Sequence, residues 1–451
     1  MARYAVSARP DWLDRGAREA LKIRVLDALG CALGACGADP TERVRRYVDT
    51  MGGAPRSLLI GGGGAATSPP LAALHNGFLV RYLDYNDSYL APGETCHPSD
   101  NLAAVLAAAE DAGADGNQLL TGLAVAYQIQ CRLCDHAPVR DRGFDHTVQG
   151  IYAATAGAAH VLGLDVDRTT HAIAIAGTAF NSLRITRTGQ LSQWKGLAYP
   201  NAAFCAVHAV YLAKMGITGP TAVFEGNKGF MQIISGPFEI DWEQEGFDSI
   251  ESTSVKRYNA EIHSQSALEA LQELRAQHEL EADRIERVDI EIFDVAYRII
   301  GGGEEGDKFE VATKEQADHS LPYLCAVMLI DGEVTPRQYR PERILAEDVQ
   351  RLLRRVHVEP NESLSRRFPA ELPCRAVVTM RDGARYAGEK SSYRGFRSDP
   401  MTWREAVDKF QELAEATPDR QRAAVVDCIR HIETRTAADL AERLAACRPH
   451  P

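Results

Sequence analysis

The densest group of side chains able to move protons lies between residues 84 and 101. The run DYNDS at 84–88 is followed within ten residues by HPSDN at 97–101. A histidine such as His97 titrates near neutral pH and can act as a general acid or base, and a helix start offers backbone donors to an anion. Ser and Asp also cap helix starts without any chemical role. Spacing alone leaves an acid–base site and ordinary helix ends equally open.

Three further segments carry titratable side chains. His146, within DHT at 145–147, precedes an Ala-rich helical pattern, where a lone histidine is more often a solvated residue at the start of a helix. KRY at 256–258, followed by His263, marks a change in sequence texture. DHSLPY at 318–323 is the third of these segments.

One basic segment stands out in an acidic chain. Arg184, Arg187 and Lys195 lie within twelve residues, interleaved with Gln193 and Trp194. Arginine binds a carboxylate or phosphate through forked hydrogen bonds, whereas lysine contributes a point charge. The segment therefore predicts a local positive pocket more readily than a solvated basic loop.

The sequence lacks the usual motifs for binding nucleotides or metals. The glycine runs at 61–64 and 301–303 lack the residues of a phosphate loop or a dinucleotide fingerprint, so turns are expected there. Cys131 and Cys134 form a lone CxxC within a helical pattern, for which a core role is favoured over zinc. An iron–sulfur cluster would need a third cysteine brought in by the fold. We expect no metal.

Composition narrows the classes of protein. The chain has 451 residues, 45% hydrophobic and 25% charged, which predicts two or three globular units. A net charge of -12 disfavours nucleic acid as a partner. No apolar run is long enough to span a bilayer, and the first residues do not resemble a signal peptide, so a cytoplasmic protein without membrane contact is expected.

The elements that must position these residues are mainly helices. Apolar residues repeat at helical spacing in the first 250 residues, which predicts an all-helical domain with helices at 21–36, 71–82, 101–112, 118–131, 148–162, 169–180 and 201–215. From about 256, alternating patterns at 288–292 and 375–380 indicate strands, mixed with helices at 264–277, 318–329 and 346–354. Helical patterns return at 402–416, 420–430 and 437–446.

This order predicts a mostly α protein with an α+β second domain. A large helical domain would comprise residues 1–255 and a returning segment, 395–451, with residues 256–394 inserted as a smaller α+β lid domain. The crevice at the domain boundary is the default binding site.

Several pieces in this order resemble the MmgE/PrpD family. They are LDYNDSYL with HPSDN, DHTVQGIYAATAGAAHVLGL, SLRITRTGQLSQWKGLAYPNAA, FEGNKGF, VKRYNAEIHSQ and ADHSLPYLCAVMLIDG. The resemblance runs along nearly the whole chain. It implies a two-domain fold, a homodimer, and activity on a small tricarboxylate or dicarboxylate without a metal or organic cofactor.

The resemblance also implies a hydro-lyase that dehydrates 2-methylcitrate, or a close tricarboxylate such as citrate, to the 2-methyl-cis-aconitate type of product. Ser88 stands where a Thr is usual, and the Ser88–His97 loop and the 184–195 run look like those of the dehydratases. Glu261 replaces a His typical of decarboxylase members. By resemblance, the catalytic positions are Asp84, His97, His146, Lys195, Lys256 and Tyr323, and substrate binding is expected from Ser88, Arg184, Arg187, Gln193 and His319.

The residue types suit that chemistry. Removing a proton next to a carboxylate builds negative charge that lysines can neutralise, while one histidine accepts a proton and another delivers one. Which histidine does which stays open. Decarboxylation of an aconitate-like acid, epimerisation of a dicarboxylate, and non-catalytic carboxylate binding are the alternatives.

Overall fold

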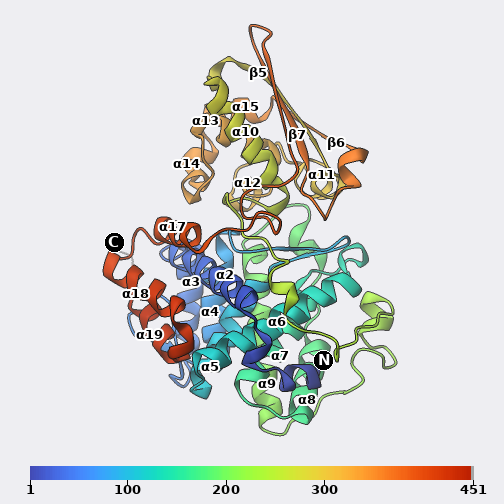
Figure 1. Cartoon of the computed structure of the whole chain (residues 1–451), viewed down its shortest axis with the longest axis vertical. Coiled ribbons are helices and arrows are strands. Elements are labelled where there is room, and N and C mark those ends of the chain that lie inside the picture. The colour runs from blue at the N-terminus through green and yellow to red at the C-terminus, as the bar shows by residue number, and fades with distance from the viewer. Residues whose placement is uncertain (448–451) are drawn as a thin grey trace. The chain divides into compact units, whose positions relative to one another are not determined.

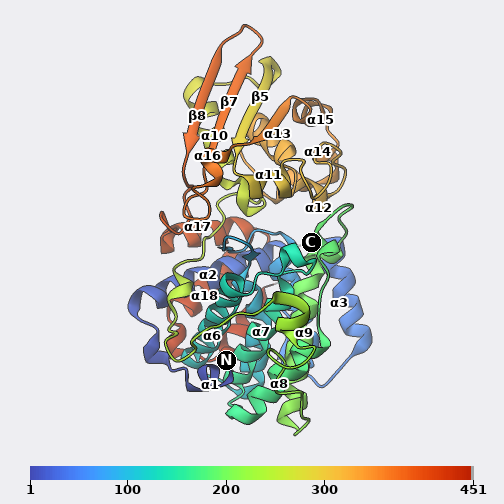
Figure 2. The ribbon, with the colours of Figure 1, turned by 90° about the vertical axis from the view of Figure 1, so that its right-hand side faces the viewer.

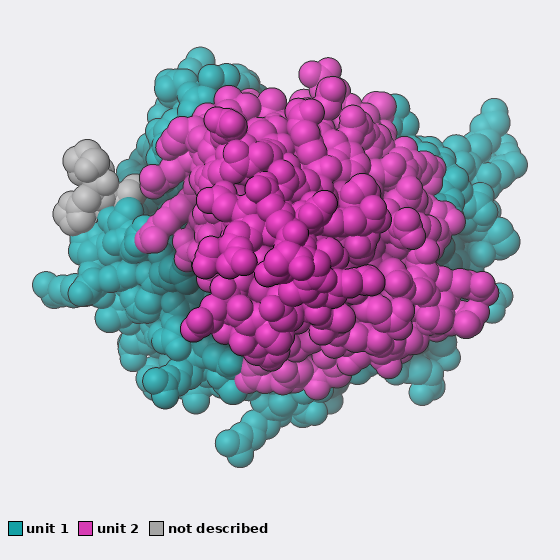
Figure 3. All heavy atoms as spheres, turned by 90° about the horizontal axis from the view of Figure 1, so that it is seen from above, with its two compact units in different colours: residues 1–184, 196–255, 401–451 teal, residues 185–195, 256–400 magenta. Residues whose placement is uncertain are grey.

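The computed structural model describes residues 1–447, which form two compact units. The first unit comprises residues 1–184, 196–255 and the segment from 401 onward, and the second comprises 185–195 and 256–400. Figure 3 colours the two units separately. The first unit is therefore built from both ends of the chain.

The first unit is a packed set of helices (Figure 1). Its centre consists of α4 (Pro69–Tyr82), α5 (Leu102–Ala112), α6 (Gly116–His136) and α7 (Thr147–Val161). These helices pack closely because many of their facing residues are small: a side chain at Gly157 of α7 would lie 2.7 Å from the carbonyl oxygen of Gly122 of α6. The backbones of α6 and α7 therefore approach more closely than larger side chains would allow.

Other helices surround this centre. The returning helix α17 (Trp403–Leu413) packs along α2 (Arg15–Gly34), so the last part of the chain completes the first unit. The remaining α-helices of the unit are α1 (Ala2–Ser7), α3 (Asp39–Met51), α8 (Val166–Ala179), α9 (Trp194–Lys214, whose first two residues are assigned to the second unit), α18 (Asp419–Arg430) and α19 (Ala437–Ala446).

The prediction that this part is all-helical needs a small correction. Two antiparallel pairs of two-residue strands occur, β1 (Ser57–Leu58) with β2 (Ala66–Thr67) and β3 (Tyr89–Leu90) with β4 (Thr95–Cys96). Strands this short show no alternating pattern in the sequence. The second pair matters because it closes the loop between Ser88 and His97.

The second unit is an α+β structure around one four-stranded sheet (Figure 2). The strand order is β6 (Val356–Pro360), β5 (Ile285–Ile292), β7 (Cys374–Met380) and β8 (Arg385–Lys390); β5 and β6 are parallel and the other neighbours are antiparallel. Helix α10 (Gln265–His278) packs on β7 and β8, and α13 (Leu321–Asp331) packs on α10 and β6. The short helices are α11 (Asp294–Ile300), α12 (Lys314–Ala317), α14 (Pro341–Ile344), α15 (Glu347–Leu353) and α16 (Glu362–Ser365).

The two faces of this sheet differ as the alternating pattern requires. Residues of β7 alternate between buried and partly exposed, and Arg375 on the more exposed side bonds to Glu291 at 2.8 Å and Glu389 at 3.1 Å. Cross-strand pairs of opposite charge suit the solvated face of a sheet. The apolar side is left to pack against the helices.

The helix predicted at 318–329 begins later, at Leu321. The Ser320 side chain accepts a hydrogen bond from the backbone N–H of Tyr323 and so caps α13, while α12 ends at Ala317. Asp318 and His319 therefore lie in a short link between two helices rather than within one. A serine two residues before Pro322 was the available signal, since Pro is favoured in a first helical turn.

The limits of the units differ from the sequence-based division at two places. Residues 185–195 pack with the second unit, where Lys195 bonds to Asp318. The chain returns to the first unit at 401 instead of 395, because the Arg394 backbone N–H donates to Glu269 and Gly395 N–H donates to the Asp399 carbonyl. Among the described residues, no helix is long and apolar enough to cross a membrane.

Candidate active site

Predicted site residues of the first unit gather around the end of α4 and the β3–β4 loop. We call this group the histidine cluster; it comprises Arg81, Asp84, Asn86, Asp87, Ser88, His97, Asp100 and His146. Every member is at most 7% exposed. So many buried polar groups require a dense hydrogen-bond network, since an unpartnered one is costly.

The His97 ring is held in one orientation. Its Nδ1 atom lies 2.8 Å from the Asp87 carbonyl oxygen and 3.0 Å from the Ser88 hydroxyl oxygen. A carbonyl oxygen only accepts, so Nδ1 carries the proton and donates a hydrogen bond to the backbone carbonyl of Asp87. A neutral His97 therefore has its lone pair on Nε2, which is the form required of a general base.

Asp84 adopts a backbone conformation that is rare for a residue with a side chain. Its φ is +56°, in the left-handed region. Its backbone N–H donates to the Arg81 carbonyl, and the Arg81 guanidinium donates to Asp84 Oδ1 at 2.6 Å. Arg81 Nε also lies 3.5 Å from Asp100 Oδ2, so one buried cation is shared by two carboxylates.

A second layer of contacts fixes the loop that carries Ser88 and His97. Asp87 accepts from the Ser99 backbone N–H at 3.0 Å and from the Tyr127 hydroxyl at 2.8 Å. Burial raises the pKa of the Asp87 carboxyl, against the effect of these donors. Asn86 bridges to Ser99 and Asp100 at 2.9 Å and 2.8 Å. The loop is thereby tied to the helical turn that follows His97.

His146 immediately precedes α7, and its ring lies beside that of His97. The two ring centroids are 5.5 Å apart with the planes nearly perpendicular, and the Tyr199 ring stacks on the other side at 6.2 Å. Asp145 Oδ1 is 3.5 Å from His146 Nδ1 and accepts from the Thr147 N–H. The structure thus brings His97 and His146 together, although 48 residues separate them in the chain.

Arg184 also belongs to the first unit. Its backbone N–H donates to the Gly143 carbonyl, and its charge, with that of Arg140, acts on Glu94. Burial nevertheless raises the pKa of the Glu94 carboxyl, which accepts from the backbone N–H groups of Val139 and Arg140. This contact anchors the tip of the β3–β4 loop.

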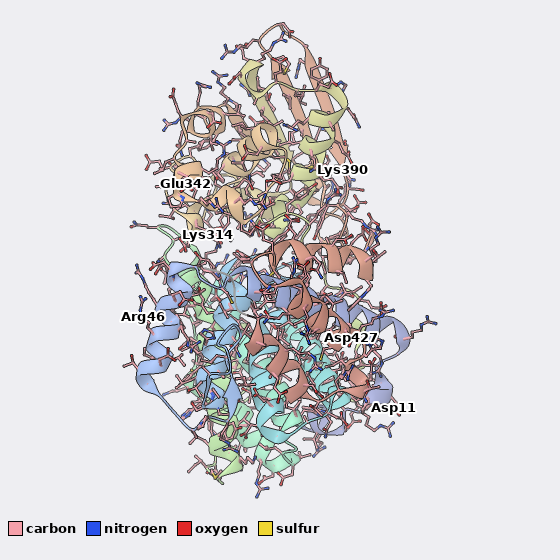
Figure 4. The ribbon with its side chains drawn as sticks, turned by 90° about the vertical axis from the view of Figure 1, so that its left-hand side faces the viewer. Asp11, Arg46, Lys314, Glu342, Lys390 and Asp427 are labelled. Carbon is pink, nitrogen blue, oxygen red and sulfur yellow. The ribbon has the colours of Figure 1, made fainter. Side chains whose placement is uncertain are left out.

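The second unit holds a group of buried and partly buried charges, which we call the lysine cluster; it comprises Lys195, Lys256, Glu261, His263, Lys308, Lys314, Asp318 and His319. Its centre is Asp318, which bonds Lys195 at 2.6 Å and Lys314 at 2.7 Å; Figure 4 labels Lys314. Burial opposes ionisation of Asp318, but the two lysines hold the pKa of its carboxyl well below the usual range. Asp318 is therefore a permanent anion.

His319 takes part in the same contact. Its Nδ1 lies 2.9 Å from Lys195 Nζ and 2.8 Å from Asp318 Oδ1. A carboxylate oxygen only accepts, so Nδ1–H and the Lys195 ammonium group both donate to Asp318. Lys195 is only 3% exposed, so its charge acts in a largely dehydrated environment.

Lys256 is fully buried and belongs to a segment fixed by α10. Gln265, the first residue of that helix, accepts from the backbone N–H groups of Arg257 and Tyr258 and donates to the Tyr258 carbonyl. Glu261 bonds the His263 ring at 2.6 Å. Burial opposes ionisation of Glu261, but His263, His319 and Lys256 lower the pKa of its carboxyl to about 2.

The remaining predicted residues of this unit have varied surroundings. The Tyr323 hydroxyl, at the start of α13, donates to the Gln338 carbonyl. Arg187 is buried and donates to the Lys195 carbonyl at 3.0 Å, so it supports Lys195 from behind. Gln193 is exposed. Catalytic or binding roles for these three residues stay predictions.

Three charged residues of these clusters were missed by sequence reasoning: Arg81, Lys308 and Lys314. For Arg81 the sequence offers one signal of a buried ion pair. It is a cation in the last turn of an apolar helix, three residues before Asp84. Lys308 lies in a loop without any regular pattern, yet it is only 5% exposed. Burial and the nearby Lys195 lower the pKa of its amine, although Glu305, Glu261 and Asp318 act in the opposite direction.

The fold also supplies the third cysteine that the CxxC pattern lacked. Cys96, Cys131 and Cys134 meet in a small buried group with Tyr89 and Ala91. Burial raises the pKa of Cys134 to about 11 and also raises the pKa of Cys96 and Cys131. The core role of these cysteines stays a prediction.

The helical unit holds two adjacent buried histidines, and the α+β unit holds buried lysines. These are the residue types that an enzyme needs for proton transfer and for stabilising negative charge. Residues 1–243 match the MmgE/PrpD N-terminal domain and residues 258–431 match the MmgE/PrpD C-terminal domain. The chain belongs to the MmgE/PrpD family, as its sequence motifs predicted.

The names of similar proteins indicate the type of reaction. The chain is 29% identical over 434 residues to 2-methylcitrate dehydratase of Salmonella typhimurium, covering 89% of this chain and 87% of that protein. It is 30% identical over 436 residues to 2-methylcitrate dehydratase of Cupriavidus necator, with the same coverage. It is 24% identical over 417 residues to cis-aconitate decarboxylase of Mus musculus, covering 87% and 81%. These names are those of lyases, and the chain is an enzyme of this class.

Proposed function

We propose that the protein is a hydro-lyase that dehydrates 2-methylcitrate, or a close tricarboxylate such as citrate, without a cofactor. The observation that carries the proposal is the fixed His97 ring, whose Nδ1 bond to Asp87 leaves Nε2 as the basic atom. The similarity to two 2-methylcitrate dehydratases supports the choice of substrate class.

The reaction requires a base beside a carboxylate-bearing carbon. His97 Nε2 accepts the proton from that carbon, and the electron pair left behind forms the double bond as the C–O bond of the neighbouring hydroxyl breaks. His146 delivers a proton to the departing oxygen, which leaves as water. The step balances because His97 takes one proton from carbon and His146 gives one proton to the departing hydroxyl for each water formed.

Negative charge that builds up on the substrate needs cations in a dry environment. Lys195 and Lys256 are both at most 3% exposed, and Lys308 adds a third buried ammonium group. Asp318 orients Lys195 through the 2.6 Å bond rather than competing for substrate protons, because its low pKa keeps it ionised. Preorganised charges of this kind lower the cost of forming an enolate-like intermediate.

Decarboxylation of an aconitate-like acid is the second candidate, because the mouse relative carries that name. Glu261 counts against it: the position resembles one where decarboxylase members have a histidine, and here it holds a carboxylate whose pKa is about 2. A permanent anion there lowers the positive charge available to the substrate. Epimerisation of a dicarboxylate is a further alternative for the reaction, and a homodimer is our expectation for the assembly.

Proton NMR in D₂O of the purified protein with 2-methylcitrate, citrate, cis-aconitate and an amino-dicarboxylate distinguishes these activities. Dehydration is expected to replace the methyl doublet of 2-methylcitrate by the methyl singlet of the alkene, and to give a vinyl resonance when citrate is the substrate. Carbon dioxide release from cis-aconitate would favour the decarboxylase, and deuterium exchange without net conversion would favour an epimerase. Binding without any spectral change would contradict the proposed reaction.

A further inference from the structure

A buried lysine from the C-terminal part of the chain contacts the loop that carries Asp84. Lys409, on α17, donates to the backbone carbonyl of Tyr85 at 2.9 Å, and its Nζ lies 3.6 Å from the centre of the Tyr85 ring. The same ammonium group bonds Asp27 of α2 at 2.7 Å. All three residues belong to the first unit.

The contact matters because Lys409 binds the residue that directly follows Asp84. Tyr85 directly follows Asp84, whose φ of +56° is strained for a residue with a side chain. On the other side, Asp84 is held by its N–H bond to the Arg81 carbonyl and by the Arg81 guanidinium. Without an anchor at Tyr85, the peptide after Asp84 can rotate and relieve the strain, and the carboxylate then leaves its place beside Arg81.

We infer that Lys409 is a positioning residue for Asp84: it fixes the Tyr85 peptide and so keeps the Asp84 carboxylate in its catalytic orientation. Lys409 is 8% exposed and Asp27 is 1% exposed, so the pair bears the cost of burying two charges. Apolar residues of similar size often give a folded protein at least as much stability as a buried ion pair does. The inference rests on the proposed function and on the catalytic position that the family resemblance implies for Asp84.

The test must separate orientation of Asp84 from loss of stability. The variant Lys409→Met leaves Asp27 buried without its partner and can fail to fold. The double variant Asp27→Asn with Lys409→Met removes both charges, so it keeps the fold but lacks the donor to Tyr85. Lys409→Arg retains a cationic donor and is the rescue variant.

Lys22 provides a matched control. It also lies on α2, is 7% exposed, bonds Glu433 at 2.6 Å and donates to the Arg430 carbonyl at 3.0 Å. Lys22→Met therefore removes a buried lysine that joins α2 to Arg430 and Glu433 instead of to Tyr85. It should lower the melting temperature without changing kcat.

For the double variant we expect kcat to fall roughly 10- to 100-fold with little change in KM, as for other small misplacements of a catalytic group. Lys409→Arg should recover most of that loss. A crystal structure of the double variant should show Asp84 outside the left-handed region. If kcat stays within twofold of the wild type, or if φ of Asp84 stays near +56° while kcat falls, the inference is wrong. Should the wild type convert none of the acids, the proposed function fails, and the crystal structure alone decides the role of Lys409.

Discussion

The Nδ1 atom of His97 lies 2.8 Å from the carbonyl oxygen of Asp87, and this bond determines which ring nitrogen can act as a base. Asp87 is itself held by Tyr127 and Ser99, so the acceptor cannot easily move away. The ring therefore needs no tautomeric change before it accepts a proton at Nε2. The proposed role of His97 follows from the backbone, not from a neighbouring carboxylate.

His97→Asn tests this assignment. The asparagine amide can still donate to the Asp87 carbonyl, so the loop should stay folded, but no atom replaces Nε2. We expect kcat to fall by about 10²- to 10⁴-fold, the usual contribution of a positioned base, with a melting temperature close to that of the wild type. The control is His208→Asn, because His208 is exposed on α9. A kcat within threefold of the wild type would exclude His97 as the base.

The two lysines bound to Asp318 allow a paired experiment. Lys195→Met should lower kcat/KM roughly 30-fold, because a hydrogen bond between charged groups is worth about 2 kcal/mol. Lys314→Met removes the other partner of the same carboxylate, at 2.7 Å, but this side chain is more exposed and should cost less than threefold. Steady-state kinetics with the active acid gives both numbers. Equal losses would mean that the lysines act only through Asp318.

Much of the fold could be predicted because its periodic patterns are long. The helical spacing in the first part of the chain and the alternation in β5 and β7 reflect one buried face each. Prediction failed where an element is too short to have a period, as for β3 and β4, or where a cap interrupts an apolar run, as at Ser320. In both places the missing information is a tertiary contact.

The site was predictable in its residue types but not in its contacts. His97 and His146 stand at helix starts, where sequence motifs mark them, yet only the fold places their rings 5.5 Å apart. Asp318 was visible within DHSLPY, but its two lysines come from 123 residues upstream and from the preceding helix. Lys308 carries no sequence signal at all, because burial of one lysine in an irregular loop depends on what packs over it.

Tyr323 is one of the catalytic positions that the family resemblance implies, and its hydroxyl donates to the Gln338 carbonyl. Tyr339 offers a matched comparison, since its ring is 6.3 Å away and its hydroxyl donates to the Asn259 carbonyl. If Tyr323 is a catalytic donor, Tyr323→Phe should lower kcat at least tenfold, while Tyr339→Phe should lower only the melting temperature. Similar kinetics in both variants would remove Tyr323 from the catalytic set.

His75 makes the stability of the first unit depend on pH. This side chain on α4 is 4% exposed, its Nδ1 donates to Asn76, and burial lowers the pKa of its imidazole from 6.5 to about 4. Because the folded pKa lies below the unfolded one, the unfolded chain binds a proton more readily between these values, so stability falls as pH decreases from about 7 toward 4. The expected loss between pH 7.5 and 5 is about 2 kcal/mol. Urea unfolding of the wild type and His75→Gln, followed by circular dichroism at several pH values, should show a shallower dependence for the variant, and parallel curves would mean that His75 titrates normally.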